Sequence, residues 1–245
     1  MNKNIFLGRI ISCILERRLP NELSRIFALF GLLVSHPSQI PFVYLWFRYR
    51  LRGGPLDNKI PWITFRAFKW LKHYLRPNMV IFEYGSGGST IFISKKAKEI
   101  ISVEHDRNWY KDVARALYKE KISNCKYVLR EPVNIADKKN HSYNYKNYTS
   151  VTMPGVSFED YVKTIEKYPD KNFNLVFIDG RARASCIFHA IPKVRPKGYI
   201  MLDNSDRWIY EEAISLLSKY KREDFFSIGP INIAMWKTSI WRIDE

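Results

Sequence analysis

Amphipathic segments and short apolar runs alternate along residues 60–220 of the chain. In the first amphipathic segment, apolar residues recur at Ile63, Ala67, Trp70 and Tyr74, which is the spacing of one face of a helix. The apolar run that follows, Met79 to Phe82, is short and therefore favours a buried strand. Further runs of this kind predict strands at residues 100–103, 127–129, 175–178 and 199–202, with helices between them.

The last part of the chain breaks this alternation, because residues 225–243 have the pattern of two strands around a turn. Strands that alternate with helices and end in a hairpin predict an α/β fold of three layers. In such a fold a mostly parallel sheet is covered on both faces and carries an antiparallel strand at one end. Residues 131–157 are polar and rich in tyrosine, and a loop of this length usually forms a lid or a binding loop.

The start of the chain differs from the rest, and we expect a helical extension over residues 1–54 before a main domain over residues 55–245. Two apolar runs, at 26–34 and 42–47, are separated by prolines, which prevent one straight helix through both. Each run is also shorter than the roughly 20 residues that a membrane-spanning helix needs. The extension is therefore not expected to cross a bilayer.

The charge of the chain favours anionic partners, since 40 Lys and Arg residues against 24 Asp and Glu residues give a net charge of +16. The basic residues of the extension are Lys3, Arg9, Arg17, Arg18, Arg25, Arg48, Arg50 and Arg52. Two interpretations of the extension remain open. It is either a cap on the main domain or a peripheral membrane anchor through residues 1–52, with its last three arginines on lipid headgroups.

Two further features bear on the location of the protein. The three cysteines, Cys13, Cys125 and Cys186, are far apart and odd in number, which favours reduced thiols over a disulfide framework. No small-residue cleavage site follows a charged start, so a secretory signal is not expected. We therefore expect a cytoplasmic protein, which an anchor would hold at the inner face of the membrane.

The sequence FEYGSGGSTIFI at residues 82–93 places a glycine-rich loop directly after the first predicted strand. A dinucleotide-binding loop needs a third glycine where this chain has Thr90, and a phosphate-binding loop needs a Lys-Ser or Lys-Thr pair that is missing here. What the loop does have is an acid, Glu83, two residues before its first glycine. A second acid, Glu104, ends the next predicted strand, where a carboxylate can bind both ribose hydroxyls of an adenosine ligand.

Together with the later motifs SVEHD, LVFIDGR and KGYIMLDNSDR, this loop makes residues 55–243 resemble the class I S-adenosylmethionine-dependent methyltransferases, a Rossmann-like family. The resemblance implies a seven-stranded sheet with an antiparallel last strand, and S-adenosylmethionine held at the glycine loop. It places Glu83 at the methionine half of the ligand, Glu104 on the ribose and His105 beside the adenine. The cofactor-binding residues expected in full are Glu83, Gly85, Ser86, Gly87, Ser89, Glu104, His105 and Asp179. Ser89 departs from the family pattern, because many members have a glycine there.

Two acidic clusters at later strand ends are candidates for catalysis: Asp179, and Asp203 with Asn204. Two carboxylates and an amide suit Mg²⁺, and the trio resembles the metal site of catechol-type O-methyltransferases. That resemblance implies that all three residues bind the ion, which would clamp two neighbouring hydroxyls of the methyl acceptor. The alternative is that Asp179 and Asp203 cap helices and hold the substrate without a metal.

Charged and aromatic side chains near these clusters are candidates for binding the acceptor. Arg181, Arg183 and Arg207 flank the acids, and Arg181 and Arg207 could hold a carboxylate or phosphate of the acceptor. Tyr148 could stack on a sugar or aromatic ring. The alternative is that these arginines and the tyrosine only line a solvated surface. Other residues noted are Tyr143 and Tyr145 beside Tyr148, His141 as a lid residue, and His189 as a core histidine.

We expect O-methylation of a small-molecule or sugar hydroxyl, with a glycan acceptor suggested by the basic apolar extension and the tyrosine-rich loop. Nucleic acid is a rival partner, but Asp179-Gly180-Arg181 replaces the motif of base N-methyltransferases, and the chain has no Pro-Cys pair for cytosine chemistry. Methylation of RNA ribose remains open, although no RNA-binding signature is present. An inactive membrane-associated scaffold is the other alternative, against which the four strand-end carboxylates argue.

Overall fold

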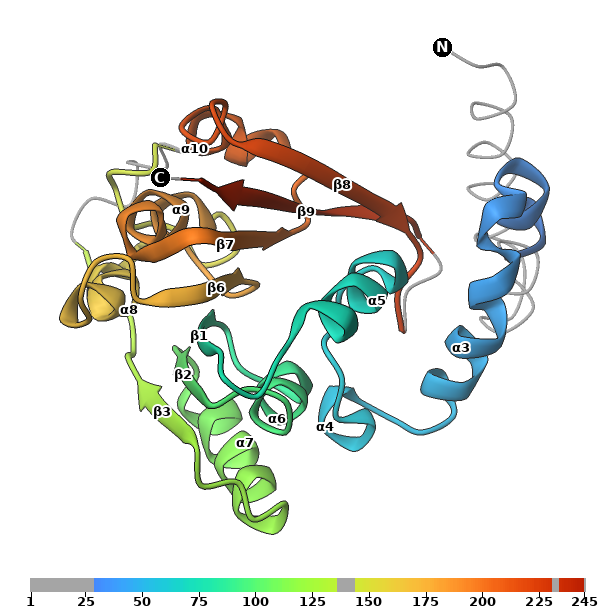
Figure 1. Ribbon diagram of the computed structural model, residues 1–245, viewed down its shortest axis with the longest axis horizontal. Coiled ribbons are helices and arrows are strands. Elements are labelled where there is room, and N and C mark those ends of the chain that lie inside the picture. The colour runs from blue at the N-terminus through green and yellow to red at the C-terminus, as the bar shows by residue number, and fades with distance from the viewer. Residues whose placement is uncertain (1–28, 136–143, 231–233, 245) are drawn as a thin grey trace.

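The computed structural model describes residues 29–135, 144–230 and 234–244, and it contains one seven-stranded sheet (Figure 1). Its strands are β1 (Val80–Tyr84), β2 (Glu99–Glu104), β3 (Cys125–Leu129), β6 (Phe173–Ile178), β7 (Val194–Asp203), β8 (Lys221–Ser227) and β9 (Trp236–Ile243). The spatial order is β3-β2-β1-β6-β7-β9-β8, and β9 runs antiparallel to both of its neighbours. The predicted mostly parallel sheet with a C-terminal hairpin is therefore confirmed.

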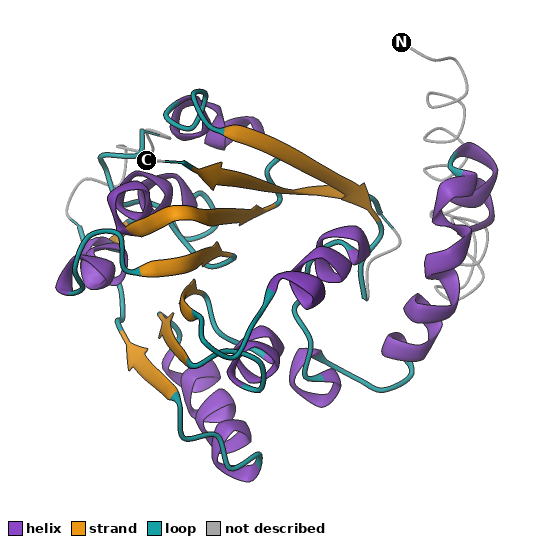
Figure 2. Cartoon of the chain, in the orientation of Figure 1, coloured by secondary structure: helices purple, strands orange, loops and turns teal. Residues whose placement is uncertain are grey.

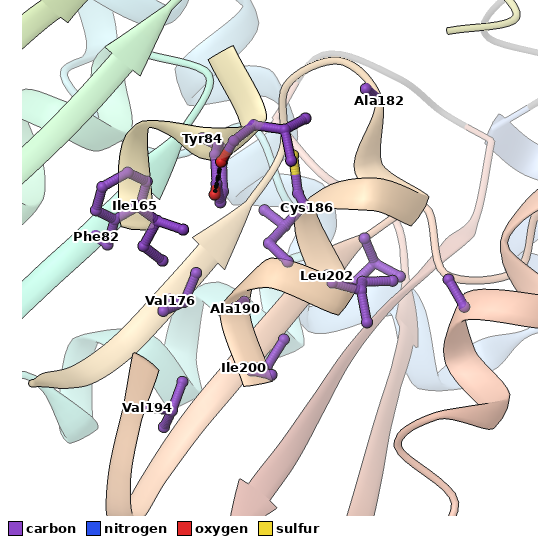
Figure 3. Close-up of a cluster of buried hydrophobic side chains, with 14 of the residues drawn as sticks. Phe82, Tyr84, Ile165, Val176, Ala182, Cys186, Ala190, Val194, Ile200 and Leu202 are labelled. Carbon is purple, nitrogen blue, oxygen red and sulfur yellow. Dashed lines mark hydrogen bonds between the residues drawn. The ribbon is translucent and has the colours of Figure 1, made fainter. Parts of the chain in front are cut away.

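Helices cover both faces of the sheet (Figure 2). On one face lie α5 (Phe65–Tyr74), α6 (Gly88–Ser94) and α7 (Arg107–Lys119), and on the other α8 (Glu159–Lys163), α9 (Arg183–Ala190) and α10 (Glu211–Ser215). Successive strand residues point to opposite faces, so Ile81 joins the core under α5 while Phe82 joins the core under α9. Figure 3 shows this second core, where side chains of β1, β6 and β7 meet those of α9. Burial on both faces explains the continuous apolar runs of the strands.

The direction of chain progression reverses between β1 and β6, because β2 and β3 lie on one side of β1 and the later strands on the other. Ligands of open α/β sheets bind at such a switch point, beyond the carboxyl ends of the strands. The glycine loop and the acids singled out in the sequence all follow these strand ends. The fold therefore gathers them at one edge of the sheet.

The predicted helices of the second half are shorter than their apolar patterns indicated. The helix predicted from Ala182 to Val194 ends at Ala190 and continues as a 3-10 turn, η3 (Ile191–Lys193), because Pro192 lacks the backbone N–H that an α-helix needs. Two other predicted helices are also partly 3-10 turns. α8 continues as η2 (Thr164–Lys167), and η4 (Trp208–Tyr210) precedes α10. In the tyrosine-rich loop, β4 (Val133–Asn134) pairs with β5 (Val156–Ser157).

The described part of the N-terminal extension packs on the main domain. It contains η1 (Pro37–Gln39) and α3 (Ile40–Arg50), and a short helix, α4 (Pro55–Asn58), follows it. Trp46 of α3 is 4% exposed and lies in one apolar cluster with Phe65 and Ile228. The buried Gln39 side chain accepts a hydrogen bond from the Ile228 backbone N–H at 3.2 Å. This part of the extension therefore contacts the main domain through one side of α3.

Some of the predicted features lie outside the described residues: the basic residues from Lys3 to Arg25, Cys13, His141 and Tyr143. Within the described part of the chain, no helix is both long and apolar enough to cross a membrane.

Candidate active site

The loop after β1 touches the loop after β6 through two glycines. Gly85 has φ +88°, a conformation that favours glycine, and a Cβ atom there would lie 2.6 Å from the Gly180 Cα atom. The Asp179 backbone N–H donates to the Tyr84 carbonyl at 2.9 Å, which continues the pairing of the two strands to this point. The close approach brings Asp179 beside the glycine loop, as the resemblance implies.

Glu83 supports the glycine loop from below. The residue has no exposed surface, and its Oε2 atom accepts hydrogen bonds from the Thr90 and Ser102 hydroxyls, each at 2.6 Å. Thr90 in turn accepts a hydrogen bond from the Gly87 N–H at 2.9 Å, so the carboxyl group fixes the loop through a hydroxyl. Burial raises the pKa of Glu83 to about 7, while hydrogen bonds from Ser102, Ser89 and Thr90 oppose the shift. The Oε1 atom of Glu83 is also buried, and it has no hydrogen-bond partner among the described residues.

Glu104 lies against the other side of the glycine loop. Its Oε2 atom accepts hydrogen bonds from the Ser86 N–H at 3.0 Å and the Ser86 hydroxyl at 2.8 Å. Its Oε1 atom accepts from the N–H groups of His105 and Asp106 at 2.8 and 3.0 Å. Burial alone would raise the pKa of Glu104, but these hydrogen bonds and the His105 side chain outweigh it and lower the pKa. Glu104 is therefore an ionised acceptor at neutral pH.

Ser86 occupies the Glu104 carboxylate in this structure and also contacts two aromatic side chains. Its hydroxyl lies 2.7 Å from the Tyr127 hydroxyl, and its carbonyl accepts a hydrogen bond from the Trp109 indole at 2.8 Å. Sequence reasoning missed both aromatic partners, because they come from β3 and α7 and only the fold brings them to the loop. The Ser86 hydroxyl thus connects Glu104 with Tyr127.

His105 lies beside Glu104, with its Nδ1 atom 2.7 Å from the Glu104 Oε1 atom. Its ring meets the Phe158 ring edge-on at 5.6 Å, and its Nε2 atom accepts a hydrogen bond from Arg181 at 3.4 Å. Ser89, in contrast, is 6% exposed and turns toward Glu83 beneath the loop. The contact of His105 with adenine stays a prediction, whereas Ser89 belongs to the support of the loop.

Arg183 joins the two acidic clusters, a role that sequence reasoning missed although the residue stands four positions after Asp179. Its guanidinium lies 3.0 Å from the Asp179 carboxylate and 3.9 Å from the Asp203 carboxylate. It also donates to the backbone carbonyls of Gly180, Asp179 and Asp203 at 2.9, 2.8 and 2.5 Å, and to the Asn204 side-chain oxygen at 3.3 Å. Burial opposes its charge, but the neighbouring carboxylates outweigh this and raise the pKa of Arg183. Burial raises the pKa of Asp179 and of Asp203, and the positive charge of Arg183 opposes this shift.

The residues predicted to bind Mg²⁺ do not fit a resident ion. The guanidinium of Arg183 already supplies the positive charge among Asp179, Asp203 and Asn204. In addition, the Oδ1 atom of Asp203 is occupied by hydrogen bonds from Trp236 and Thr238 at 2.8 and 2.6 Å. No group of three or more His, Cys, Asp or Glu side chains suited to a metal occurs in the described part of the chain. The structure therefore does not support the predicted Mg²⁺ ion. The Arg183 guanidinium supplies the positive charge beside the two carboxylates instead.

The three candidate acceptor-binding residues are not gathered in one place. Arg181 reaches His105 and donates to the Thr152 hydroxyl at 2.7 Å, so it connects the site to the tyrosine-rich loop. Arg207 is exposed, and its charge acts on Asp179. The Tyr148 ring instead lies 5.6 Å from the ring of His189 and 5.4 Å from the Lys163 ammonium. Tyr148 therefore lies against α8 and α9 and not at the carboxyl ends of the strands.

His189 is a core histidine, as predicted. It is 8% exposed, and its Nδ1 atom lies 2.7 Å from the Glu166 carboxylate.

Comparison with known proteins agrees with this architecture. No protein-family model matches the sequence, and no curated protein matches it. Among solved structures, the O-methyltransferase TomG of Streptomyces achromogenes, in complex with S-adenosylmethionine, matches with a TM-score of 0.56 at 13% identity. The match covers 85% of this chain and 99% of that one. The chain has the Rossmann-like methyltransferase fold.

An rRNA methylase from Streptococcus thermophilus also matches, with a TM-score of 0.49 at 8% identity over 74% of this chain and 95% of that one. At 13% identity the likeness to TomG concerns the fold alone.

Proposed function

We propose that this protein is an S-adenosylmethionine-dependent methyltransferase that methylates a hydroxyl of a small molecule or sugar. One observation carries the proposal: a buried, ionised carboxylate, Glu104, ends β2 and lies directly against the glycine loop after β1. An ionised acceptor at the switch point of a parallel sheet is suited to the paired hydroxyls of a ribose. The unpartnered Oε1 atom of Glu83 gives the loop a second buried acceptor.

Asp179 is the candidate general base for the reaction. When bound, the cofactor supplies an electrophilic methyl group. In the proposed transfer the acceptor oxygen would form a carbon–oxygen bond as the carbon–sulfur bond of the cofactor breaks, and S-adenosylhomocysteine would leave. The hydroxyl proton needs an acceptor, and the Asp179 side chain keeps 22% of its surface exposed whereas that of Asp203 keeps 4%. The raised pKa of Asp179 makes its deprotonated form a stronger base than an ordinary carboxylate.

Arg183 positions this base without touching the acceptor. It holds the Asp179 carboxylate and the backbone of both strand ends in one arrangement, so the proposed reaction includes no metal ion. Arg181 and Arg207 stand at the exposed side of the site and are suited to a carboxylate or phosphate on the acceptor.

Binding of the cofactor is tested by calorimetry with S-adenosylhomocysteine. The intact protein is expected to bind it, and Glu104→Gln is expected to weaken binding by about 1–3 kcal/mol, because ribose hydroxyls would lose an ionised acceptor. Glu131→Gln serves as the matched control, since this exposed carboxylate pairs with Arg107 near the end of the next strand, and it should leave binding unchanged. Absence of binding by the intact protein would remove the proposal.

The acceptor class is tested by transfer of a labelled methyl group to hydroxylated small molecules, sugars and RNA. Label in an alkali-stable methyl ether of a small molecule or sugar supports the proposal, and label only in RNA contradicts it. Asp179→Asn should reduce kcat, measured at saturating cofactor, by about 100-fold or more. An equally fast Asp179→Asn enzyme would show that another group accepts the proton.

A further inference from the structure

The outward face of α3 carries a row of exposed apolar side chains. Ile40, Tyr44, Phe47 and Leu51 are 57%, 70%, 44% and 85% exposed, and their spacing of four, three and four residues places them on one side of the helix. We call these four residues the outer stripe. Large apolar side chains scattered singly over a surface are ordinary, but a contiguous row marks an interaction site.

The opposite face of α3 holds the outer stripe in position. Trp46 is buried in the cluster with Phe65 and Ile228, and the Phe42 ring stacks on the Phe65 ring at 5.7 Å. A helix that is apolar on all sides normally lies buried on all sides. In α3 only one side is buried by the described part of the protein, so the outer stripe remains available to a partner.

The charge around the outer stripe is strongly positive. Residues 29–70 contain six Lys and Arg residues and one acid, Asp57. Arg48 and Arg52 are exposed and stand on either side of Leu51 along the chain, at the end of the stripe. Phe30 and Val34, on the preceding helical residues, are also exposed, by 67% and 69%. Apolar side chains next to exposed arginines are the pattern of a helix that lies in a membrane interface.

We propose that the outer stripe of α3 binds a membrane surface that contains anionic lipids. The apolar side chains enter the boundary between headgroups and acyl chains, and Arg48 and Arg52 contact lipid phosphates. A nucleic acid would satisfy the arginines but not four exposed apolar side chains. A helix of 11 residues is about 16 Å long and lies on the bilayer instead of crossing it.

The position of α3 relates this surface to the candidate active site. The neighbour of Phe65, Thr64, lies with its hydroxyl 3.1 Å from the Thr238 hydroxyl, which in turn donates to the Asp203 carboxylate. α3 therefore packs at the same edge of the sheet at which Asp203 ends β7. Membrane binding would bring the catalytic edge close to the lipid surface, although the binding proposal stands without the proposed function.

Cosedimentation of the full chain with lipid vesicles tests the proposal. The protein is expected to bind vesicles of phosphatidylcholine and phosphatidylglycerol in equal parts and to bind phosphatidylcholine alone weakly. Tyr44→Ser with Leu51→Ser should weaken binding by about tenfold or more, because two apolar side chains no longer enter the interface. The control, Tyr118→Ser with Val133→Ser, removes two apolar side chains that are 88% and 60% exposed elsewhere, and it should change nothing.

A second pair of variants tests the contribution of charge. Arg48→Gln with Arg52→Gln should weaken binding by about fivefold for each arginine, and added salt should abolish the difference. Lys111→Gln with Lys119→Gln, two exposed positions on α7, is the control for net charge. Circular dichroism spectra identical to those of the unaltered protein show that each variant is folded.

Three results would overturn the proposal. The first is an intact protein that binds neither kind of vesicle. The second is binding that the stripe variants and their controls weaken equally, which would place the lipid contact elsewhere. The third is a stripe variant that turns a dimer into a monomer in light scattering while vesicle binding is unchanged.

Discussion

Replacement of Arg183 by methionine tests whether one guanidinium holds together the acidic clusters after β6 and β7. The Arg183 side chain is 10% exposed and faces the carboxylates of Asp179 and Asp203. Its removal leaves two buried acids side by side and three backbone carbonyls without their donor. Breaking a buried ion pair of this kind typically costs about 3–5 kcal/mol. We expect a loss of that size in the free energy of unfolding.

Urea unfolding at neutral pH, followed by circular dichroism, measures this loss. The double variant Arg183→Met with Asp179→Asn should lose at least about 1 kcal/mol less than the sum of the single variants, because they share one interaction. Arg115→Met is the matched control, since its side chain is 78% exposed and pairs with Asp112 on the surface, and it should cost less than about 0.5 kcal/mol.

Magnesium supplies the decisive comparison. If Arg183 takes the place of an ion, Mg²⁺ should leave the melting temperature of the unaltered protein unchanged and should raise that of Arg183→Met, in which two carboxylates lack a cation. The reasoning is refuted by a loss below about 1 kcal/mol, by additive single variants, or by an unaltered protein that Mg²⁺ stabilises.

Three further predictions concern the glycine loop. Burial raises the pKa of Glu83 from 4.5 to about 7, so its contribution to stability is complete below pH 4.5 and is lost as pH rises to 7, by about 3 kcal/mol in all. Glu83→Gln should remove this pH dependence from the free energy of unfolding, and an unchanged pH dependence would contradict the raised pKa of Glu83. In calorimetry, Ser86→Ala should bind S-adenosylhomocysteine as tightly as the unaltered protein or up to about fivefold more tightly, because the ribose no longer displaces the Ser86 hydroxyl from Glu104. Weaker binding would show that Ser86 itself contacts the ligand. Gly85→Ala should lower the free energy of unfolding in urea by at least about 1–3 kcal/mol, because its Cβ atom would strike Gly180. Gly54→Ala should cost far less, because a Cβ atom there lies 3.6 Å from the nearest atom, Asp57 Oδ2. Equal losses would contradict the close approach of the two loops.

The sequence predicted the sheet, and the edge at which the candidate residues gather, because both depend on local patterns. Buried parallel strands need short apolar runs, and each run here ends at a chemically distinctive residue such as Glu104 or Asp179. Since parallel strands place their carboxyl ends at one edge, the strand pattern alone assigns residues far apart in the chain to one site. The hydrophobic pattern was less informative where 3-10 turns follow short helices, because Pro192 and tertiary packing end those helices early.

The tertiary structure decided which charges meet. The sequence shows Asp179 and Arg183 four residues apart, but it does not show that the left-handed turn at Ala182, with φ +47°, and the pairing of β6 with β7 direct the guanidinium onto Asp203 and Asn204. A metal was therefore expected where an arginine lies. In the same way, the sequence shows an apolar run at residues 42–47 of the extension but not which of its side chains are buried. Only the fold, which brings Phe65 and Ile228 against Trp46, decided which side packs on the protein and which faces outward.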